Sequence, residues 1–304
     1  MTETYLAGTT PDRLLLATDF SARCDRALDR AAQLASEWRA ELVVLKVLEP
    51  AASADLALAW AGGRASDEPL LHLARQQLVR DLSGMNVPAT LHTAWSNDAA
   101  AAIRTTAIGA HAGMVVTGVS RNEITGRFLA GSTVERLARS LPQPLLVVRY
   151  RAHASYQRIV VASDFSASSS RALQAAARLF PGRELILYHA DDMPMSSLVK
   201  GLPSSLVEGI PSSPIGLDKQ RAECSAFLAA TGLPAHVKVR PVIERGAVET
   251  ALTQYVRQHD IDLVVMGTQG RGAIMSLLLG STAAKLLDWL PCDTLLVREP
   301  RANE

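Results

Sequence analysis

The sequence predicts an α/β protein built from two tandem doubly wound domains, each with a five-stranded parallel sheet flanked by helices. First, the chain of 304 residues repeats itself: residues 13–35 and 158–180 are identical at twelve of 23 positions. Second, each half alternates short Val, Leu and Ile runs with amphipathic segments, as in parallel sheets covered on both faces. A period near 150 residues indicates duplicated domains, because solenoid repeats are much shorter.

The two ends of the repeat locate the domain boundary. Gly-Ser-Thr occurs at residues 131–133 and again at 280–282, so the offset between the halves is 145 at the front and 149 at the back. The connecting stretch, residues 150–157, is polar and lacks strong periodicity. We therefore expect one domain over residues 1–152 and a second over residues 153–304.

The elements of the first half follow from apolar runs and helical spacing. A buried strand is expected at Leu14–Ala17, and Asp19 or Ser21 is expected to cap a helix that runs to about Trp38. The elements expected after it are strands at residues 42–47, 90–94, 114–117 and 145–148, and helices at residues 70–82, 99–110 and 132–141.

The second half repeats this order of elements. Its expected strands are Ile159–Ala162, Leu185–His189, Val237–Val242, Leu263–Met266 and Thr294–Val297. Ligands of doubly wound sheets bind beyond the carboxyl ends of the strands, where the winding changes direction. A site is therefore expected at those strand ends.

A long excursion follows the second strand of each half. In the second half it covers about residues 191–217 and combines Pro, Gly and Ser with Leu, Val and Ile. Loops of this length are usually functional or disordered. Because it leaves the sheet on the ligand side, it is interpreted as a lid or as an interaction surface, and the sequence leaves both open.

Composition argues against several classes of protein. The chain has 31 basic and 30 acidic residues, which gives no electrostatic reason to expect nucleic-acid or anionic-membrane binding. No apolar run reaches the roughly 18 residues of a membrane helix, and the first residues lack a secretory signal pattern. The three cysteines are far apart, which fits a reducing cytoplasm. No HxxxH or CxxC group is present, so no metal site in the protein is predicted.

The pattern that carries chemistry follows the strand Leu263–Met266. Gly267-Thr-Gln-Gly270 precedes nine residues and then Gly280-Ser281-Thr282, at the expected start of a helix. Glycines let the backbone take positive φ and approach a ligand closely. A helix start offers unpaired N–H groups and a positive dipole end to phosphate oxygens, and Arg271 adds a positive charge.

This GxxG, nine residues, GS pattern resembles the ATP-binding loop of the universal stress protein family. The family's apolar–Asp motif is matched by Val160-Val-Ala-Ser-Asp164 and Leu15-Leu-Ala-Thr-Asp19, so the resemblance covers nearly the whole chain in two copies. It implies an adenine-nucleotide α-hydrolase-like fold that holds ATP, with Mg or Mn on the phosphates. The cofactor-binding residues that it implies are Ala162, Ser163, Asp164, Ala190, Met266, Gly267, Gly270, Arg271, Gly280, Ser281 and Thr282.

Two residues of the second half, one inside this set and one outside it, have structural alternatives. Asp164 is also interpreted as a helix-capping carboxylate, which is compatible with a place in the site. His189, at the end of a predicted strand, is interpreted as a buried histidine with one hydrogen bond, and contact with the ligand is its alternative.

The first half departs from the pattern. It reads Gly118-Val-Ser-Arg121, nine residues, Gly131-Ser132, so Arg121 replaces the second glycine. Arginine does not easily adopt positive φ or leave room for a close phosphate. The first half is therefore predicted to be degenerate and structural, and the alternative is that the Arg121 guanidinium binds an anion.

These features predict an ATP-binding regulatory protein of the stress response, switched by nucleotide and acting on an unknown protein partner. No general base can be named, so efficient hydrolysis is not expected. A slow ATPase or nucleotidyl-transfer enzyme using Asp164 and a metal is one alternative. A nucleotide-independent adaptor or small-molecule carrier is the other.

The last strand of each half, Leu145–Val148 and Thr294–Val297, is expected at a sheet edge. An apolar edge strand needs a partner. The resemblance implies that these two strands pair with each other, so that one chain imitates the family's dimer. Further assembly of chains into a homodimer is left open.

Overall fold

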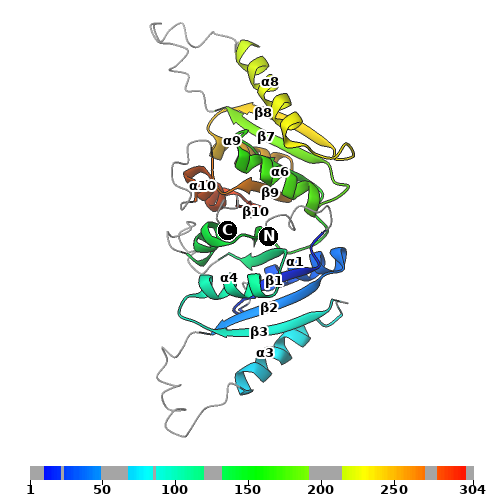
Figure 1. The fold of residues 1–304 in the computed structure, drawn as a ribbon, viewed down its shortest axis with the longest axis vertical. Helices are drawn as coiled ribbons and strands as arrows, with labels where there is room; N and C mark the ends of the chain where they lie inside the picture. Colours follow the sequence, from blue (N-terminus) through cyan, green and yellow to red (C-terminus); the bar gives the residue numbers. More distant parts are fainter. Residues whose placement is uncertain are drawn as a thin grey trace. The chain divides into compact units, whose positions relative to one another are not determined.

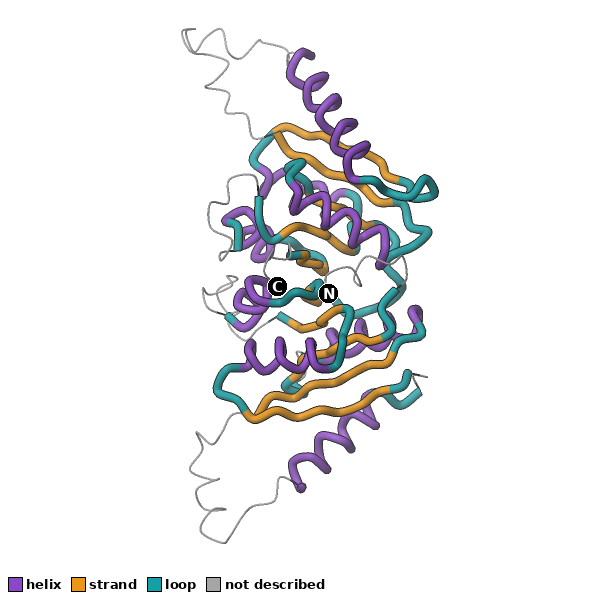
Figure 2. Tube along the Cα trace, viewed as in Figure 1, coloured by secondary structure: helices purple, strands orange, loops and turns teal. Residues whose placement is uncertain are grey.

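The computed structural model describes residues 10–21, 24–48, 68–84, 87–119, 132–191, 214–270 and 279–298. Its internal contacts divide the chain between Ser155 and Tyr156 into two compact units (Figure 1). In each unit strands alternate with helices along the chain (Figure 2). The two units are therefore described separately.

The first unit contains a fully parallel sheet. Its strands are β1 (Arg13–Thr18), β2 (Glu41–Leu48), β3 (Ala89–Trp95), β4 (Met114–Gly118) and β5 (Leu145–Val148), in the order β3-β2-β1-β4-β5. Its helices are α1 (Asp25–Trp38), α3 (Glu68–Asp81), α4 (Ala99–Gly109) and α5 (Thr133–Ser140).

The second unit repeats this topology. Its strands are β6 (Ile159–Ala162), β7 (Leu185–Asp191), β8 (Val239–Arg245), β9 (Leu263–Gly267) and β10 (Asp293–Val297), in the order β8-β7-β6-β9-β10. Its helices are α6 (Ala167–Leu179), α8 (Pro214–Thr231), α9 (Val248–Gln258) and α10 (Ser281–Trp289). Helix α6 packs on α8 and α9 packs on α10, as expected when right-handed crossovers place the two pairs on opposite faces.

The centre of each sheet explains why these sequences form parallel strands. Leu14–Leu16 of β1 and Ile159–Val161 of β6 are completely buried. A strand covered on both faces needs a continuous apolar run, and β-branched residues suit it. In the second unit the winding changes direction between β6 and β9, because β6 lies between β7 and β9. A site is therefore expected above the carboxyl ends of these strands.

The predicted fold class is confirmed, and all ten strands occur close to their expected positions. Strand β8 is shifted, starting at Val239 instead of Val237. The Val237 N–H donates to the carbonyl of Pro234 at 3.0 Å, so Val237 belongs to a turn.

The predicted cap of the first helix is wrong. Helix α1 begins at Asp25 with Cys24 as its N-cap, and neither Asp19 nor Ser21 caps it. The carboxylate of Asp19 instead accepts from the Ser21 N–H at 2.8 Å. Phe20, at φ 59°, turns the backbone there, so the helix starts later.

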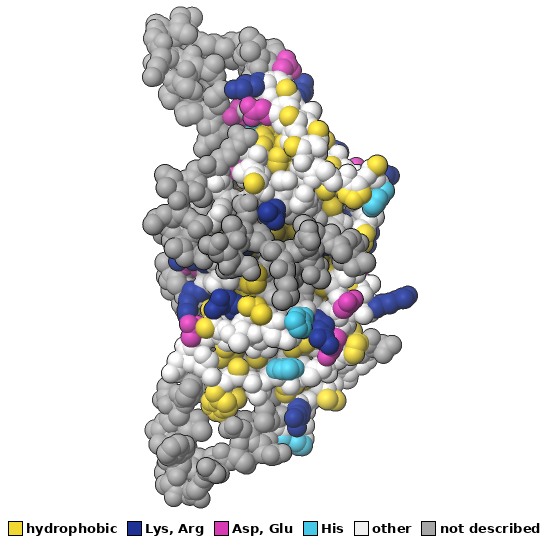
Figure 3. All heavy atoms as spheres, in the orientation of Figure 1, with side chains coloured by type: hydrophobic (Ala, Val, Ile, Leu, Met, Phe, Trp, Pro, Cys, Tyr) yellow, Lys and Arg dark blue, Asp and Glu magenta, His cyan; other side chains and the backbone are white. Residues whose placement is uncertain are grey.

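Within the described residues, no helix combines the length and apolar character needed to cross a membrane. On the face drawn in Figure 3, basic and acidic side chains of the described residues are interspersed. Most of the 191–217 excursion lies outside the described residues, and so do Arg121 and Gly131.

Candidate functional site

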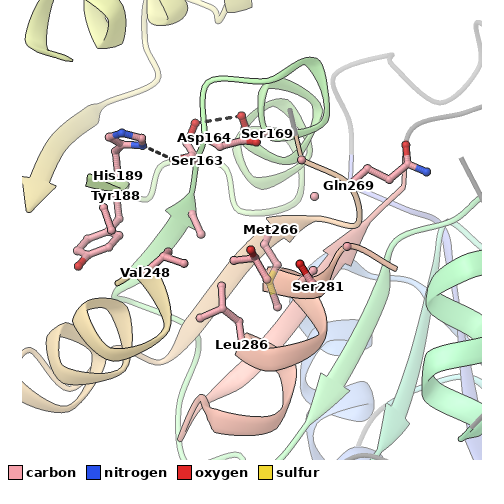
Figure 4. Close-up of a pocket in the computed structure, with 17 residues that line it drawn as sticks. Ser163, Asp164, Ser169, Tyr188, His189, Val248, Met266, Gln269, Ser281 and Leu286 are labelled. Atoms are coloured by element: carbon pink, nitrogen blue, oxygen red, sulfur yellow. Dashed lines mark hydrogen bonds between the residues drawn. The ribbon is translucent and has the colours of Figure 1, made fainter. Parts of the chain in front are cut away.

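A cavity of about 550 Å³ lies at the carboxyl ends of β6, β7 and β9 in the second unit (Figure 4). This volume is within the range of small-molecule sites. Ten of the eleven predicted site residues line it: Ala162, Ser163, Asp164, Ala190, Met266, Gly267, Gly270, Gly280, Ser281 and Thr282. The eleventh, Arg271, lies outside the described residues.

The cavity has an apolar part and a polar part. Val248, Met266 and Leu286 gather in one part of the cavity, whereas Asp164 and Ser169 lie in another (Figure 4). Met266 and Leu286 are almost fully buried, so the packing around them holds these two lining side chains in place. Pockets of this kind hold ligands that have an apolar body and polar groups placed for orientation.

Asp164 enters the cavity from a tight turn after β6. The next residue, Phe165, has φ 60°, a left-handed conformation that costs roughly 1–3 kcal/mol for a bulky residue. Asp164 Oδ1 accepts from the Ser166 N–H at 3.1 Å. The capping interpretation of Asp164 is wrong, because Ser166 is the N-cap of α6 and its Oγ accepts from the Ser169 N–H. The Asp164 side chain is half-buried at the cavity wall.

Ser163 connects this turn to its neighbours. Its Oγ accepts from the Phe165 N–H and bonds the Ser169 hydroxyl, both at 3.0 Å. Its carbonyl accepts from His189 Nδ1 at 2.8 Å. Half-buried His189 therefore makes the single hydrogen bond that the sequence favoured, and it also lines the cavity, as its alternative required.

Two of the loop glycines, Gly267 and Gly270, are needed for space. None of Gly267, Gly270 and Gly280 has positive φ, so that part of the expectation is wrong. A Cβ on Gly267 would lie 2.2 Å from Ser168 Oγ, and one on Gly270 would lie 3.0 Å from Asp164 Oδ2. At these positions, neighbouring atoms of the protein itself leave no room for a side chain.

The N-terminus of α10 also borders the cavity. Its N-cap is Gly280, which has no side chain to cap the helix. Ser281 and Thr282, in the first turn, line the cavity. Uncapped N–H groups and the positive end of the helix dipole favour an anionic group at this position.

The first unit treats the equivalent serine differently. Ser132 corresponds to Ser281, yet Ser132 is itself the N-cap of α5 and its Oγ accepts from the Glu135 N–H at 3.2 Å. The hydroxyl is thus occupied by its own helix, because α5 begins one residue later in the repeat than α10.

Charge in the cavity is sparse. Asp164 is the only carboxylate among the described lining residues, and these include no Lys or Arg. Tyr188, almost fully buried, donates to Glu244 at 2.7 Å. Burial, and then this bond to a carboxylate, raise the pKa of Tyr188 above its usual value, so the phenol stays neutral.

Several lining residues were missed from the sequence. Leu286 lies one turn after Thr282 on the same helix face, so helical spacing would have found it. Tyr188 and Val248 carry no local signal, because they reach the cavity through the packing of α9 on β7. Ser169, Gln269 and Ala283 adjoin motifs that were recognised.

The order of strands and the cavity at the switch point define a protein of the adenine-nucleotide α-hydrolase-like fold. The model of the universal stress protein family matches residues 11–149 and again residues 155–298. The chain therefore belongs to the universal stress protein family, as a tandem of two such domains.

Known proteins agree with this assignment. A universal stress protein of Mycolicibacterium smegmatis is 26% identical over 312 residues, covering 94% of this chain and 96% of that protein. One from Thermus aquaticus is 40% identical over 81 residues, which are 27% of this chain and only 55% of that protein. The crystal structure of a universal stress protein from Archaeoglobus fulgidus shares the fold, with a TM-score of 0.61, 17% identity and coverage of 98% and 100% of the two chains.

Proposed function

We propose that the second domain, residues 153–304, binds ATP and that the chain is a regulatory protein of the stress response. The observation that carries this proposal is the cavity in which ten residues of the implied ATP site meet beside the uncapped N-terminus of α10. Occupancy by nucleotide would favour one conformation of the surrounding loops and so change the surface offered to an unknown protein partner.

Two ends of the cavity suit the two parts of the nucleotide. The end of the cavity beyond β6 and β7 suits the nucleoside, because the family resemblance assigns the adenine to the position of Ala190 and the nucleoside to that of Asp164. The N-terminus of α10 and the hydroxyls of Ser281 and Thr282 suit phosphates, on which Mg or Mn would neutralise charge. The proposal is for binding and not for efficient hydrolysis; the enzyme alternative would require Asp164 to act together with a phosphate-bound metal.

We propose one competent site per chain. In the first domain, residues 1–152, the hydroxyl of Ser132 is occupied in capping α5 and Arg121 replaces a loop glycine. Because of these two features, the loop has fewer groups that could hydrogen-bond a phosphate or approach it closely. This domain then has a structural role.

Calorimetric titration of nucleotide-stripped protein with Mg-ATP tests both proposals. One site per chain is expected, and Asp164→Ala should weaken it. Because one solved universal stress protein is a complex with cAMP, cAMP is titrated in parallel. Two sites would contradict the degenerate first domain, and no saturation in folded protein would contradict ATP binding altogether.

We further propose a cytoplasmic protein in which Leu145–Val148 and Thr294–Val297 pair within one chain. Cysteines placed opposite each other in these strands should cross-link within single chains, as read by mass on a denaturing gel. Cross-links only between chains would favour a homodimer instead.

A further inference from the structure

We infer that His189 is a positioning residue for Asp164: from the neighbouring strand it holds the turn Ser163–Phe165, and so sets where the Asp164 carboxylate lies. The inference deepens the proposed function and rests on it, because the position of this carboxylate matters to a ligand only if the cavity binds one.

The imidazole contacts the residue on each side of Asp164. His189 Nδ1 donates to the carbonyl of Ser163 at 2.8 Å, and because a carbonyl only accepts, Nδ1 carries the proton. On the other side, the ring stacks on Phe165 with centroids 4.3 Å apart and planes 28° apart. Asp164 is thus held between two contacts from one side chain on β7.

The turn needs such a contact from outside. Phe165 lies in the left-handed region, at φ 60°, where a bulky residue persists only when its surroundings hold it. Two bonds of the turn are local: the Phe165 N–H donates to Ser163 Oγ and the Ser166 N–H donates to Asp164 Oδ1. The Ser163 N–H also donates to the carbonyl of Tyr188 on β7 at 2.9 Å. The two local bonds form only when the turn is in place, whereas β7 contacts it from outside through the Tyr188 carbonyl and the His189 side chain. Of these, the His189 side chain reaches past Asp164 to the Phe165 ring.

The first unit makes the same arrangement with a different residue. Phe20 has φ 59°, and Asp19 Oδ1 accepts from the Ser21 N–H. On β2, Lys46 occupies the register position of His189; its Nζ donates to the carbonyl of Asp19 at 3.0 Å and lies 5.0 Å from the centre of the Phe20 ring.

Two unlike side chains therefore make similar contacts: each bonds a carbonyl of the turn and contacts the phenylalanine ring. The carbonyls differ by one position, because His189 bonds Ser163 and Lys46 bonds Asp19, the counterpart of Asp164. This agreement between the repeats indicates that the pair of contacts is what the turn requires. It also predicts which substitution of His189 is tolerated, because lysine is already used at this position in the other repeat.

The Asp164 carboxylate lies close to the glycine loop, so a shift of the carboxylate would disturb that loop. A Cβ on Gly270 would lie only 3.0 Å from Asp164 Oδ2, so the turn and the glycine loop are in close contact. Loss of the His189 contacts would loosen this arrangement without unfolding it, because Phe227 of α8 also packs on Phe165 at 5.4 Å.

Three variants test the inference: His189→Leu, His189→Lys and, as a matched control in the other repeat, Lys46→Leu. Each is titrated with Mg-ATP by calorimetry, after circular dichroism has shown it to be folded. We expect His189→Leu to raise Kd roughly three- to tenfold, the usual effect of one lost hydrogen bond. His189→Lys should restore affinity close to that of the parent, and Lys46→Leu should leave it unchanged.

A second readout needs no ligand. Amide hydrogen exchange of Phe165 and Ser166 should become faster in His189→Leu and slow again in His189→Lys. Unchanged exchange in His189→Leu would overturn the inference even if affinity fell, because His189 would then act on the ligand directly. If the parent protein bound no Mg-ATP, the proposed function would fail, while the exchange rates would still decide whether His189 holds the turn.

Discussion

Gly267 at the end of β9 lies so close to Ser168 of α6 that a Cβ atom on the glycine would be 2.2 Å from the serine Oγ. The first glycine of the proposed phosphate loop is therefore required by the contact between a helix and a strand. A substitution here would displace α6, which carries the Asp164 turn at its start.

Gly267→Ala is expected to destabilise the second unit by about 1–3 kcal/mol, because overpacking forces the backbone apart. Urea unfolding measures the change. Gly109→Ala is the control, because a Cβ there meets nothing within 4 Å; as Gly109 lies in α4, the change should leave stability unchanged or raise it by up to about 1 kcal/mol. Equal effects of the two changes would show that the close contact does not constrain the fold.

The two equivalent serines should behave in opposite ways. Ser132→Ala removes the cap of α5 and should cost about 1 kcal/mol in unfolding free energy, with no effect on Mg-ATP affinity. Ser281→Ala removes no cap, so stability should hold while affinity falls a few-fold. Denaturant unfolding and calorimetry on both variants check this. If Ser132→Ala weakened binding as much as Ser281→Ala, the single-site proposal would be untenable.

Gly270→Ala is expected to weaken Mg-ATP binding by displacing the Asp164 carboxylate, which is 3.0 Å from the new Cβ. Because the two residues act through one contact, Gly270→Ala should add little in an Asp164→Ala background. A double-mutant cycle on Kd measures this coupling. Fully additive effects would mean that Gly270 acts on the ligand independently of Asp164.

At alkaline pH, the Tyr188→Phe variant is expected to lose less unfolding free energy than the parent protein. The raised pKa of Tyr188 means that the unfolded chain releases this proton near pH 10 while the folded chain keeps it. Stability is therefore full below about pH 10 and falls by about 1.4 kcal/mol per pH unit above it. Urea unfolding between pH 8 and 11 checks the difference between parent and variant, which should grow only above pH 10.

The sequence predicted the strands well because central strands such as Ile159–Ala162 are continuous apolar runs, which leave few alternatives. It predicted ten lining residues because these follow strand ends in a recognisable order. It could not predict the positive φ of Phe165, since the contact that supports it comes from His189 on another strand. The same turn moved the helix cap from Asp164 to Ser166.

The sequence also could not show why glycine is needed in this loop. Positive φ is the usual use of glycine, and it occurs at Gly182 and Gly246, but Gly267 and Gly270 serve close packing. Which atom would collide with a Cβ depends on how α6 packs against β9. The residues around each glycine in the sequence do not reveal that packing.

The difference of one residue in where α5 and α10 begin shows how copies of a domain diverge. In one copy a serine hydroxyl closes its own helix, and in the other the same serine remains available beside a cavity. Neither arrangement alters the order of strands in its sheet. A duplicated domain can therefore gain or lose a recognition function by a small change at one helix terminus, while its architecture is inherited intact.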